Sequence, residues 1–335
     1  MIKLFDLPKS DVPVNNLLSD RFLVPPFSIL DSRLGYWAKR KNDWKKLGLK
    51  SELGRGDYII DEGGNFKENK DFKGNVIHNS FGEKYGRKDM SQTSIFDPVL
   101  CEIVYRWFLP NDTNHNKIID TFAGGSVRGV VASCLNKSYT GIDLRKEQIY
   151  ANNLQFNEFL QNNDVNITFR PNWICGDSLD LDNLIKDEKF DLFFTCPPYF
   201  DLELYSDDPN DLSNQGSYNE FLTIYTNIIS KAYNKLNDDS FAVIVVGEIR
   251  DKSGNYYNFV GDTIKAFMNC GFNYYNEAIL ITPIGTLPLR VGKQFNSGRK
   301  VGKSHQNVLV FYKGNTKTIK DKFGEVVSET FEEIF

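Results

Sequence analysis

Two short apolar runs constrain the fold of this chain most strongly. Residues 190–195 read Phe-Asp-Leu-Phe-Phe-Thr, and residues 241–247 read Phe-Ala-Val-Ile-Val-Val-Gly. Runs of this kind are typical of strands that are buried on both faces. Such strands belong to sheets that are covered by helices on both sides, so the two runs predict the middle of an α/β sheet.

Strand and helix patterns alternate through the rest of residues 91–315. Helices are expected at residues 97–107, 127–135, 145–160, 218–236 and 259–270. Strands are expected at residues 117–120, 139–143, 190–195, 241–247, 274–282 and 307–312, with one more ending at residues 173–175. This alternation predicts a doubly wound, mostly parallel sheet. No helix is expected between the last two strands, which predicts that they pair antiparallel at one edge.

The chain of 335 residues is long enough for one large core and an appendage. Residues 1–90 are rich in proline, glycine and polar residues, and only residues 33–47 show a helix pattern. We therefore expect three parts: an N-terminal extension at 1–90, partly irregular, a main domain at 91–315 and a C-terminal tail at 316–335.

Composition excludes several classes of protein. The five cysteines form no CxxC pair and the three histidines are dispersed, so neither a disulfide framework nor a metal site is expected. No apolar run approaches the roughly 20 residues of a membrane span. A cytoplasmic protein without a membrane partner is the expectation. Because the net charge is −4, any contact with nucleic acid must come from local basic patches.

The segment Asp120-Thr-Phe-Ala-Gly-Gly-Ser126 lies between an expected strand and an expected helix. In open α/β sheets, ligands bind at the carboxyl ends of the strands, and glycines let the backbone approach a ligand closely. The segment is neither a GxGxxG fingerprint nor a phosphate loop. It therefore indicates a ligand site but disfavours a nicotinamide-dependent oxidoreductase; an ordinary tight turn is the structural alternative.

Two further carboxylates follow expected strands on the same edge. Asp143 ends the next strand, about 20 residues after the turn, where an acidic residue commonly bonds ribose hydroxyls. Asp177 follows Gly176 after the third strand. Each aspartate can instead serve as a helix cap or a turn residue.

The tetrapeptide Cys196-Pro197-Pro198-Tyr199 follows the first apolar run. Two consecutive prolines fix the backbone and remove two hydrogen-bond donors. The result is a rigid edge of carbonyl groups beside an aromatic ring that can stack on a planar ligand. On its own, Pro-Pro also serves as a simple strand terminator.

In this order, the four segments resemble those of the amino-directed DNA methyltransferases, which methylate N6 of adenine or N4 of cytosine. The resemblance covers residues 91–313. The Pro-Pro-Phe-Ser-Ile-Leu-Asp segment at residues 25–31 also resembles phage and prophage DNA methylases. The family implies a fold of the S-adenosylmethionine-dependent methyltransferase type, S-adenosylmethionine as cofactor and DNA as partner, with RNA not excluded.

The resemblance also implies roles for individual residues. In the family, the glycine-rich turn holds the methionine part of the cofactor, Asp143 corresponds to the ribose ligand, and Asp177 corresponds to the ligand of the adenine amine. Thr93–Pro98 resembles a motif that also touches the cofactor. The implied cofactor site comprises Thr93, Phe96, Asp97, Asp120, Phe122, Ala123, Gly124, Gly125, Asp143, Leu144, Gly176 and Asp177.

The implied catalytic segment is Cys196, Pro197, Pro198 and Tyr199, with Tyr199 stacking on a base flipped out of the duplex. The family has Asp, Asn or Ser where this chain has Cys196, and sulfur is a weak hydrogen-bond acceptor. The alternative is a pyrimidine carbon-5 methyltransferase, with Cys196 as nucleophile and Glu248 as acid. A nucleotide-dependent oxidoreductase and a non-catalytic nucleic-acid-binding module are less favoured alternatives.

A basic segment lies near the C-terminus. Residues 278–320 contain no Asp or Glu, which suits contact with phosphates, although a solvated loop shows the same pattern. Target-recognition loops are expected at residues 200–217 and 283–306. The candidate nucleic-acid-binding residues are Arg290, Lys293, Arg299, Lys300, Lys303 and His305.

Overall fold

A computed structural model describes most of the chain. It covers residues 24, 26–49, 96–110, 116–165, 167–200, 208–285 and 287–323. It also gives the backbone of a separate antiparallel pair of strands, β2 (Tyr58–Ile60) and β3 (Phe66–Glu68). Among the described helices, each is too short or too polar to span a lipid bilayer.

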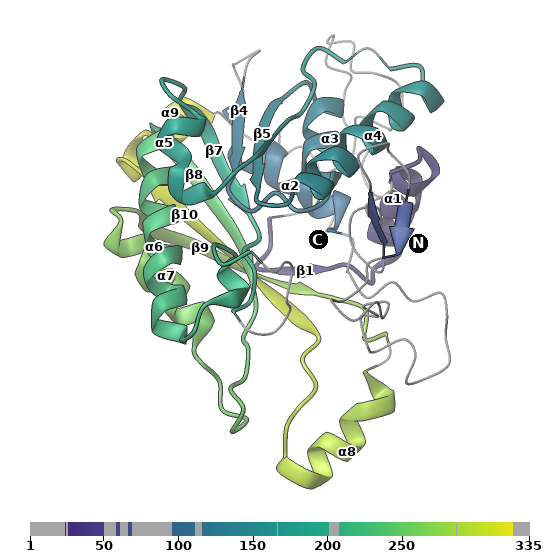
Figure 1. Cartoon of the computed structure of the whole chain (residues 1–335), viewed down its shortest axis with the longest axis vertical. Coiled ribbons are helices and arrows are strands. Elements are labelled where there is room, and N and C mark those ends of the chain that lie inside the picture. Colours follow the sequence, from purple (N-terminus) through teal and green to yellow (C-terminus); the bar gives the residue numbers. More distant parts are fainter. Residues whose placement is uncertain are drawn as a thin grey trace.

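One eight-stranded sheet forms the centre of the molecule (Figure 1). Strands β7, β4, β5, β6 and β8 run parallel, which confirms the predicted mostly parallel, doubly wound sheet. The strand order reverses between β4 and β7, so the carboxyl ends of these two strands open onto the crevice where α/β sheets bind ligands. In spatial order the strands are β1 (Ile29–Asp31), β9 (Asn273–Ile281), β10 (His305–Lys313), β8 (Leu236–Val246), β7 (Phe190–Thr195), β4 (Lys117–Asp120), β5 (Ser138–Asp143) and β6 (Asn172–Cys175).

The antiparallel strand lies inside the sheet and not at its edge. Strand β10 pairs antiparallel with both β8 and β9. The edge is formed by β1, which pairs parallel with β9 through Leu30 and Leu280. Strand β1 is only three residues long and follows Pro25 and Pro26, so its sequence shows no strand period. Its place in the sheet is a tertiary contact with residues 250 positions away.

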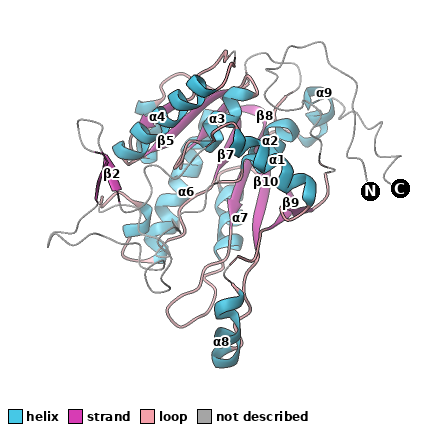
Figure 2. Ribbon diagram, turned by 90° about the vertical axis from the view of Figure 1, so that its right-hand side faces the viewer, coloured by secondary structure: helices cyan, strands magenta, loops and turns pink. Residues whose placement is uncertain are grey.

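Helices cover both faces of the sheet (Figures 1 and 2). Along β7, Leu192 and Phe194 face one apolar cluster and Phe193 faces the other. Because side chains alternate along a strand, each buried strand supplies both clusters. The first cluster includes residues of α1 (Gly35–Lys46), α2 (Pro98–Phe108), α3 (Val127–Cys134) and α4 (Lys146–Asn162), and the second includes residues of α5 (Leu181–Leu184), α6 (Tyr218–Lys235) and α7 (Phe259–Asn269).

Helix α1, from the N-terminal extension, is attached to α2 by a buried ion pair. The Glu102 carboxylate is fully buried and accepts hydrogen bonds from the Arg40 guanidinium at 2.9 and 2.6 Å. It also accepts one from the Trp44 indole at 3.2 Å. Because this charge is neutralised within the core, α1 is part of the folded domain and not a separate appendage.

Helix α8 (Pro288–Gly298) lies in the segment expected to be a loop, and it projects away from the sheet (Figure 2). Pro288 occupies the first turn, where proline favours helix initiation. None of its side chains is buried, and Leu289 is 81% exposed. Gly292 and Gly298 are poor helix formers, and they mask this helix in the sequence. The remaining short elements are η2 (Ser178–Asp180), η3 (Leu212–Asn214), η4 (Thr316–Thr318) and α9 (Ile319–Phe323).

Candidate active site

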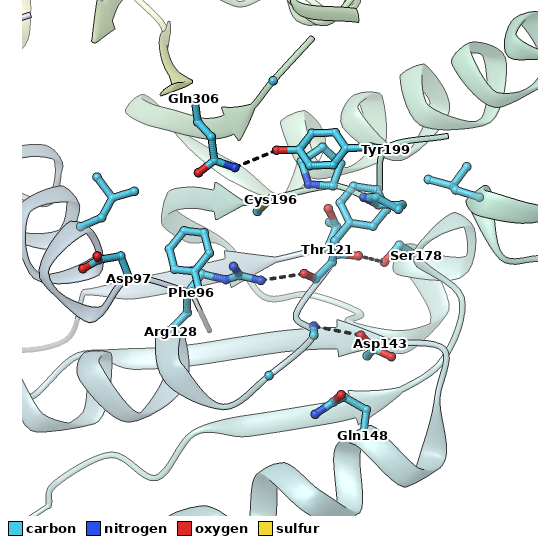
Figure 3. A pocket seen from close by; sticks show the side chains of 18 of the residues that line it. Phe96, Asp97, Thr121, Arg128, Asp143, Gln148, Ser178, Cys196, Tyr199 and Gln306 are labelled. Atoms are coloured by element: carbon cyan, nitrogen blue, oxygen red, sulfur yellow. Dashed lines mark hydrogen bonds between the residues drawn. The ribbon is translucent and has the colours of Figure 1, made fainter. Parts of the chain in front are cut away.

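A cavity of about 640 Å³ opens at the carboxyl ends of the central strands (Figure 3). It joins the predicted cofactor segments to the predicted catalytic tetrapeptide. The predicted residues that line it are Phe96, Asp97, Phe122, Gly124, Gly125, Asp143, Leu144, Gly176, Asp177, Cys196, Pro197, Pro198, Tyr199, Glu248, Lys303 and His305.

Other predicted residues do not line this cavity. Asp120 and Ala123 are fully buried in its wall. Thr93 lies outside the described residues, as do residues 201–207 of the first expected recognition loop. Arg290, Lys293, Arg299 and Lys300 lie in α8 or just after it, away from the cavity lining.

The glycine-rich turn is held directly to the end of β5. The Gly124 backbone N–H donates to Asp143 Oδ2 at 2.9 Å, and the Ala123 N–H donates to the Ile142 carbonyl at 2.9 Å. Gly124 has a φ of +50°, a left-handed conformation that glycine adopts without steric cost. Asp143 therefore shapes the turn as well as lining the cavity.

Gln148 and Asn152 in α4 support the same turn and were not anticipated from the sequence. The Gln148 amide donates to Asn152 Oδ1 at 2.9 Å, and the Asn152 amide donates to the Gly124 carbonyl at 2.7 Å. Gln148 also lines the cavity. Its signal in the sequence is weak because α4 contains several polar residues, and only the fold shows which of them face the turn.

Asp177 caps the next segment of the cavity wall. Its Oδ1 accepts from the Leu179 N–H at 2.8 Å, and its other carboxylate oxygen accepts no hydrogen bond from the described residues. The neighbouring Ser178 hydroxyl donates to the Thr121 carbonyl at 2.7 Å, which ties this segment to the glycine-rich turn. Asp177 thus retains an acceptor for a ligand.

Asp120 organises the wall behind the cavity. Its fully buried carboxylate accepts from Arg128 Nε at 2.5 Å, from the Tyr139 hydroxyl at 2.7 Å and from the Thr195 hydroxyl at 2.6 Å. Arg128 also donates to the Phe122 carbonyl at 2.7 Å. These bonds connect β4, β5, β7 and α3, so Asp120 acts on the site through its neighbours. Arg128 was not anticipated, although an arginine within the apolar helix pattern of residues 127–135 is a visible signal.

The tetrapeptide begins directly after Thr195, which Asp120 anchors. Pro197 is buried, and the half-buried Tyr199 ring packs edge-on against Phe259 with 5.9 Å between ring centres. The Tyr199 hydroxyl accepts a hydrogen bond from the Gln306 amide at 3.0 Å (Figure 3). The ring is therefore held by groups on two other elements, and Gln306 is a further lining residue that the sequence did not indicate.

Glu248 holds the start of α7. One carboxylate oxygen accepts from the Phe259 N–H and the other from the Val260 N–H, both at 3.1 Å. Negative charge at a helix N-terminus is stabilising. Glu248 therefore caps α7 through both of its side-chain oxygens.

The N-terminal extension also reaches the cavity. Lys41 of α1 lines it and pairs with Asp97 Oδ2 at 2.9 Å. Asp97 caps α2 through the Val99 N–H, as its Asp-Pro sequence predicts. Its carboxylate also accepts from the Trp37 indole at 3.2 Å. The end of the cavity near Phe96 is thus built partly by residues that precede position 91.

Gly141 provides a test of how tightly the site wall is packed. A β-carbon at this position would lie 2.7 Å from the Tyr139 ring and 2.8 Å from the Ala123 β-carbon. Gly141→Ala is expected to lower the free energy of unfolding by about 1–3 kcal/mol through overpacking. Urea denaturation measures this loss, with Gly35→Ala as the control because a β-carbon there meets no atom within 4 Å. Equal stability of the two variants would contradict the packing argument.

Comparison with known families identifies the C-terminal part of the chain. Residues 190–332 match the model of the N6_N4_Mtase family, which is described as DNA methylase. This part of the chain is similar to the DNA methylase family. The match supports a methyltransferase that uses S-adenosylmethionine as cofactor, in agreement with the doubly wound sheet. The match also weighs against the oxidoreductase alternative.

Matches to solved structures are distant. TrmN from Thermus thermophilus is 12% identical with a TM-score of 0.40, and the match covers 64% of this chain and 48% of TrmN. A methyltransferase from Pyrococcus furiosus is 15% identical with a TM-score of 0.42, covering 68% of this chain and 87% of that one. An rRNA methylase from Streptococcus thermophilus is 10% identical with a TM-score of 0.39, and the match covers 67% of this chain and 100% of the rRNA methylase. The chain spans about half the length of TrmN. No curated protein was found to match the sequence.

Proposed function

We propose that this protein is a DNA methyltransferase that transfers a methyl group to an exocyclic amine, cytosine N4 or adenine N6, of a base flipped out of the duplex. The observation that carries the proposal is that one cavity joins the glycine-rich turn and its acidic edge to the Cys-Pro-Pro-Tyr segment. The DNA methylase family match supports the same substrate class.

The residues of the cavity fit the proposed cofactor. The volume of about 640 Å³ is within the roughly 300–1,000 Å³ of ordinary ligand sites. Gly124 leaves room for close approach, while Asp143 and the unbonded oxygen of Asp177 offer acceptors for hydroxyl and amine groups. The hydroxyl of Thr121, at the wall, has no hydrogen-bond partner among the described residues. When bound, S-adenosylmethionine supplies an electrophilic methyl group on a sulfonium.

The chain's own residues orient the acceptor base. The rigid Cys196-Pro197 edge presents carbonyl oxygens that accept hydrogen bonds from the target amine, and Tyr199 provides the ring on which the base stacks. A base in this position has its amine lone pair directed at the cofactor part of the cavity. Catalysis then consists mainly of positioning the amine, with the product proton leaving to solvent.

The projecting α8 arm suits contact with the duplex. It carries Arg290 and Lys293, and Arg299 follows it, with its guanidinium 5.1 Å from the centre of the Phe295 ring. Leu289 and Phe295 are exposed beside these cations. A basic helix without acidic residues matches the charge of the DNA backbone, and its apolar side chains can contact base edges in a groove. We assign target recognition to this arm.

The carbon-5 alternative predicts a different result for Cys196→Ser. Obligatory covalent attack requires the thiolate, whereas amine methylation requires only the backbone carbonyls. Both Glu248 oxygens accept backbone hydrogen bonds at the start of α7, which gives this side chain a helix-capping role. Cys196→Ser is therefore expected to retain methylation within about tenfold of the unaltered protein, since a serine side chain is nearly isosteric.

Nucleoside mass spectrometry tests both the proposed amine methylation and the carbon-5 alternative. The substrate is genomic DNA from a bacterial host that lacks its own DNA methylases and expresses the unaltered chain or Cys196→Ser. N4-methylcytosine or N6-methyladenine supports the proposal. A 5-methylcytosine product that disappears in Cys196→Ser would establish the carbon-5 alternative. No methylated nucleoside, together with no heat of binding for S-adenosylmethionine, would overturn the proposed function.

A further inference from the structure

Lys303 places an unpaired cation at the wall of the cavity. Its Nζ is buried and has no hydrogen-bond partner among the described residues. Lys303 lines the cavity together with Tyr199, Gly247 and Glu248. Burial lowers the pKa of Lys303, and the nearby charge of Glu248 acts in the opposite direction. A buried ammonium without acceptors is unfavourable in the protein alone, and an acceptor supplied by a bound ligand would satisfy it.

This ammonium lies beside the tetrapeptide that ends in Tyr199, and not beside the glycine-rich turn. A β-carbon placed on Gly247 would lie 3.2 Å from Lys303 Nζ and 3.9 Å from the Tyr199 hydroxyl oxygen. Both groups thus lie against the bare backbone at the end of β8. Gly247 is the residue after this strand, and a side chain there would displace the ammonium. Strand β8 neighbours β7, whose end carries Cys196, so the Lys303 ammonium lies at the end of the strand next to the proposed base site.

We infer that Lys303 is a specificity-determining residue whose ammonium donates a hydrogen bond to the ring nitrogen next to the exocyclic amine of the target base. This inference rests on the proposed function. An ammonium has three donors and no acceptor. The ring nitrogens next to the amine are N3 of cytosine and N1 or, across the ring fusion, N7 of adenine, and each carries a lone pair. Thymine has N3–H and guanine has N1–H at the corresponding edge, and these donors oppose the ammonium.

Lys303 differs in position from the other basic residues of its segment. Arg290 and Lys293 lie on the exposed α8 and suit phosphate contacts, which carry no sequence information. Lys303 follows the arm and immediately precedes β10, where Gln306 bonds the Tyr199 hydroxyl. One short stretch of chain therefore holds both the stacking ring and the proposed donor to the base.

The test uses synthetic duplexes that contain the target site, mapped from the methylated genomic DNA of the expressing host. In one set the target base is unaltered, and in the other it is 3-deazacytosine, 1-deazaadenine or 7-deazaadenine, in which a C–H replaces one ring nitrogen. The unaltered protein is expected to lose about tenfold to a hundredfold in kcat/KM on the analogue that lacks the bonded nitrogen. Lys303→Met is expected to show a similar loss on the unaltered base and no further loss on that analogue.

Two controls distinguish this role from a structural one. Lys303→Met removes an unpaired buried charge, so its thermal unfolding midpoint is expected to be equal to or higher than that of the unaltered protein. Lys265→Met removes an exposed charge on α7 outside the cavity lining and is expected to leave the analogue discrimination intact. Equal activity of the unaltered protein on all analogues, or full discrimination by Lys303→Met, would overturn the inference. Absence of any methylated base with the unaltered protein would instead overturn the proposed function, and the inference with it.

Discussion

Tyr199→Ala is expected to reduce kcat/KM for DNA methylation by roughly tenfold to a hundredfold, because stacking of a base on an aromatic ring contributes about 1–3 kcal/mol. The ring is fixed on one side by Phe259 and at its hydroxyl by Gln306, so it is oriented before any base enters. Alanine removes the stacking surface and leaves the cofactor end of the cavity unchanged. Affinity for S-adenosylmethionine, measured by calorimetry, should therefore change little.

Tyr199→Phe is the matched control for this effect. It keeps the ring and removes only the hydroxyl that accepts the Gln306 hydrogen bond. A neutral hydrogen bond contributes about 0.5–1.5 kcal/mol, so the expected loss is less than about tenfold. Steady-state methylation of a duplex that contains the mapped target measures both variants. If Tyr199→Ala methylated as fast as Tyr199→Phe, the ring would have no stacking role.

Among the substitutions considered, Arg128→Met is expected to lower the free energy of unfolding most. The guanidinium neutralises Asp120, which is fully buried, and its removal leaves that carboxylate with only neutral hydrogen-bond donors. Burial alone would lower the pKa of Arg128, but the Asp120 charge raises it above its ordinary value. Breaking a buried pair from one side costs about 3–5 kcal/mol. We expect a fall of that size in the free energy of unfolding.

Urea denaturation of Arg128→Met and of two further variants tests whether the unpaired Asp120 charge causes the loss of stability. Arg106 is a partner of Glu102, and the Arg106 side chain is 29% exposed. Arg106→Met is therefore expected to lower the free energy of unfolding by less than about 1 kcal/mol. The double variant Arg128→Met with Asp120→Leu removes both charges and is expected to recover part of the stability, because apolar replacements of a buried pair are often tolerated. A double variant less stable than Arg128→Met alone would show that Asp120 stabilises the wall mainly through Tyr139 and Thr195.

The sequence predicted the central sheet well because local patterns specify it. The runs at residues 190–195 and 241–247 became β7 and most of β8, and the Asp97-Pro98 pair became the cap of α2. The turn at Gly124, the carboxylate at Asp143 and the tetrapeptide after β7 meet in one cavity as expected. Each of these follows a strand of a parallel sheet, and parallel strands bring their carboxyl ends to one edge.

Other features depend on contacts between residues distant in the chain. The pairing of β1 with β9, the placement of β10 inside the sheet and the Arg40–Glu102 pair have no local signature. Helix α8 was missed because Gly292 and Gly298 made its segment resemble a loop, and because its side chains are not buried against the sheet.

By itself, the sequence determined an α/β fold and predicted a methyltransferase-type site, because the elements along the chain and the motifs after each strand are local properties. Only the tertiary structure decided which polar groups face the cavity. It directed Asp120 into the wall, where Arg128 neutralises it, and it left the Lys303 ammonium beside Tyr199 without a partner among the described residues. The physical reason is that burial and pairing of a charge depend on what packs around it, and for these residues the neighbours come from other elements of the fold.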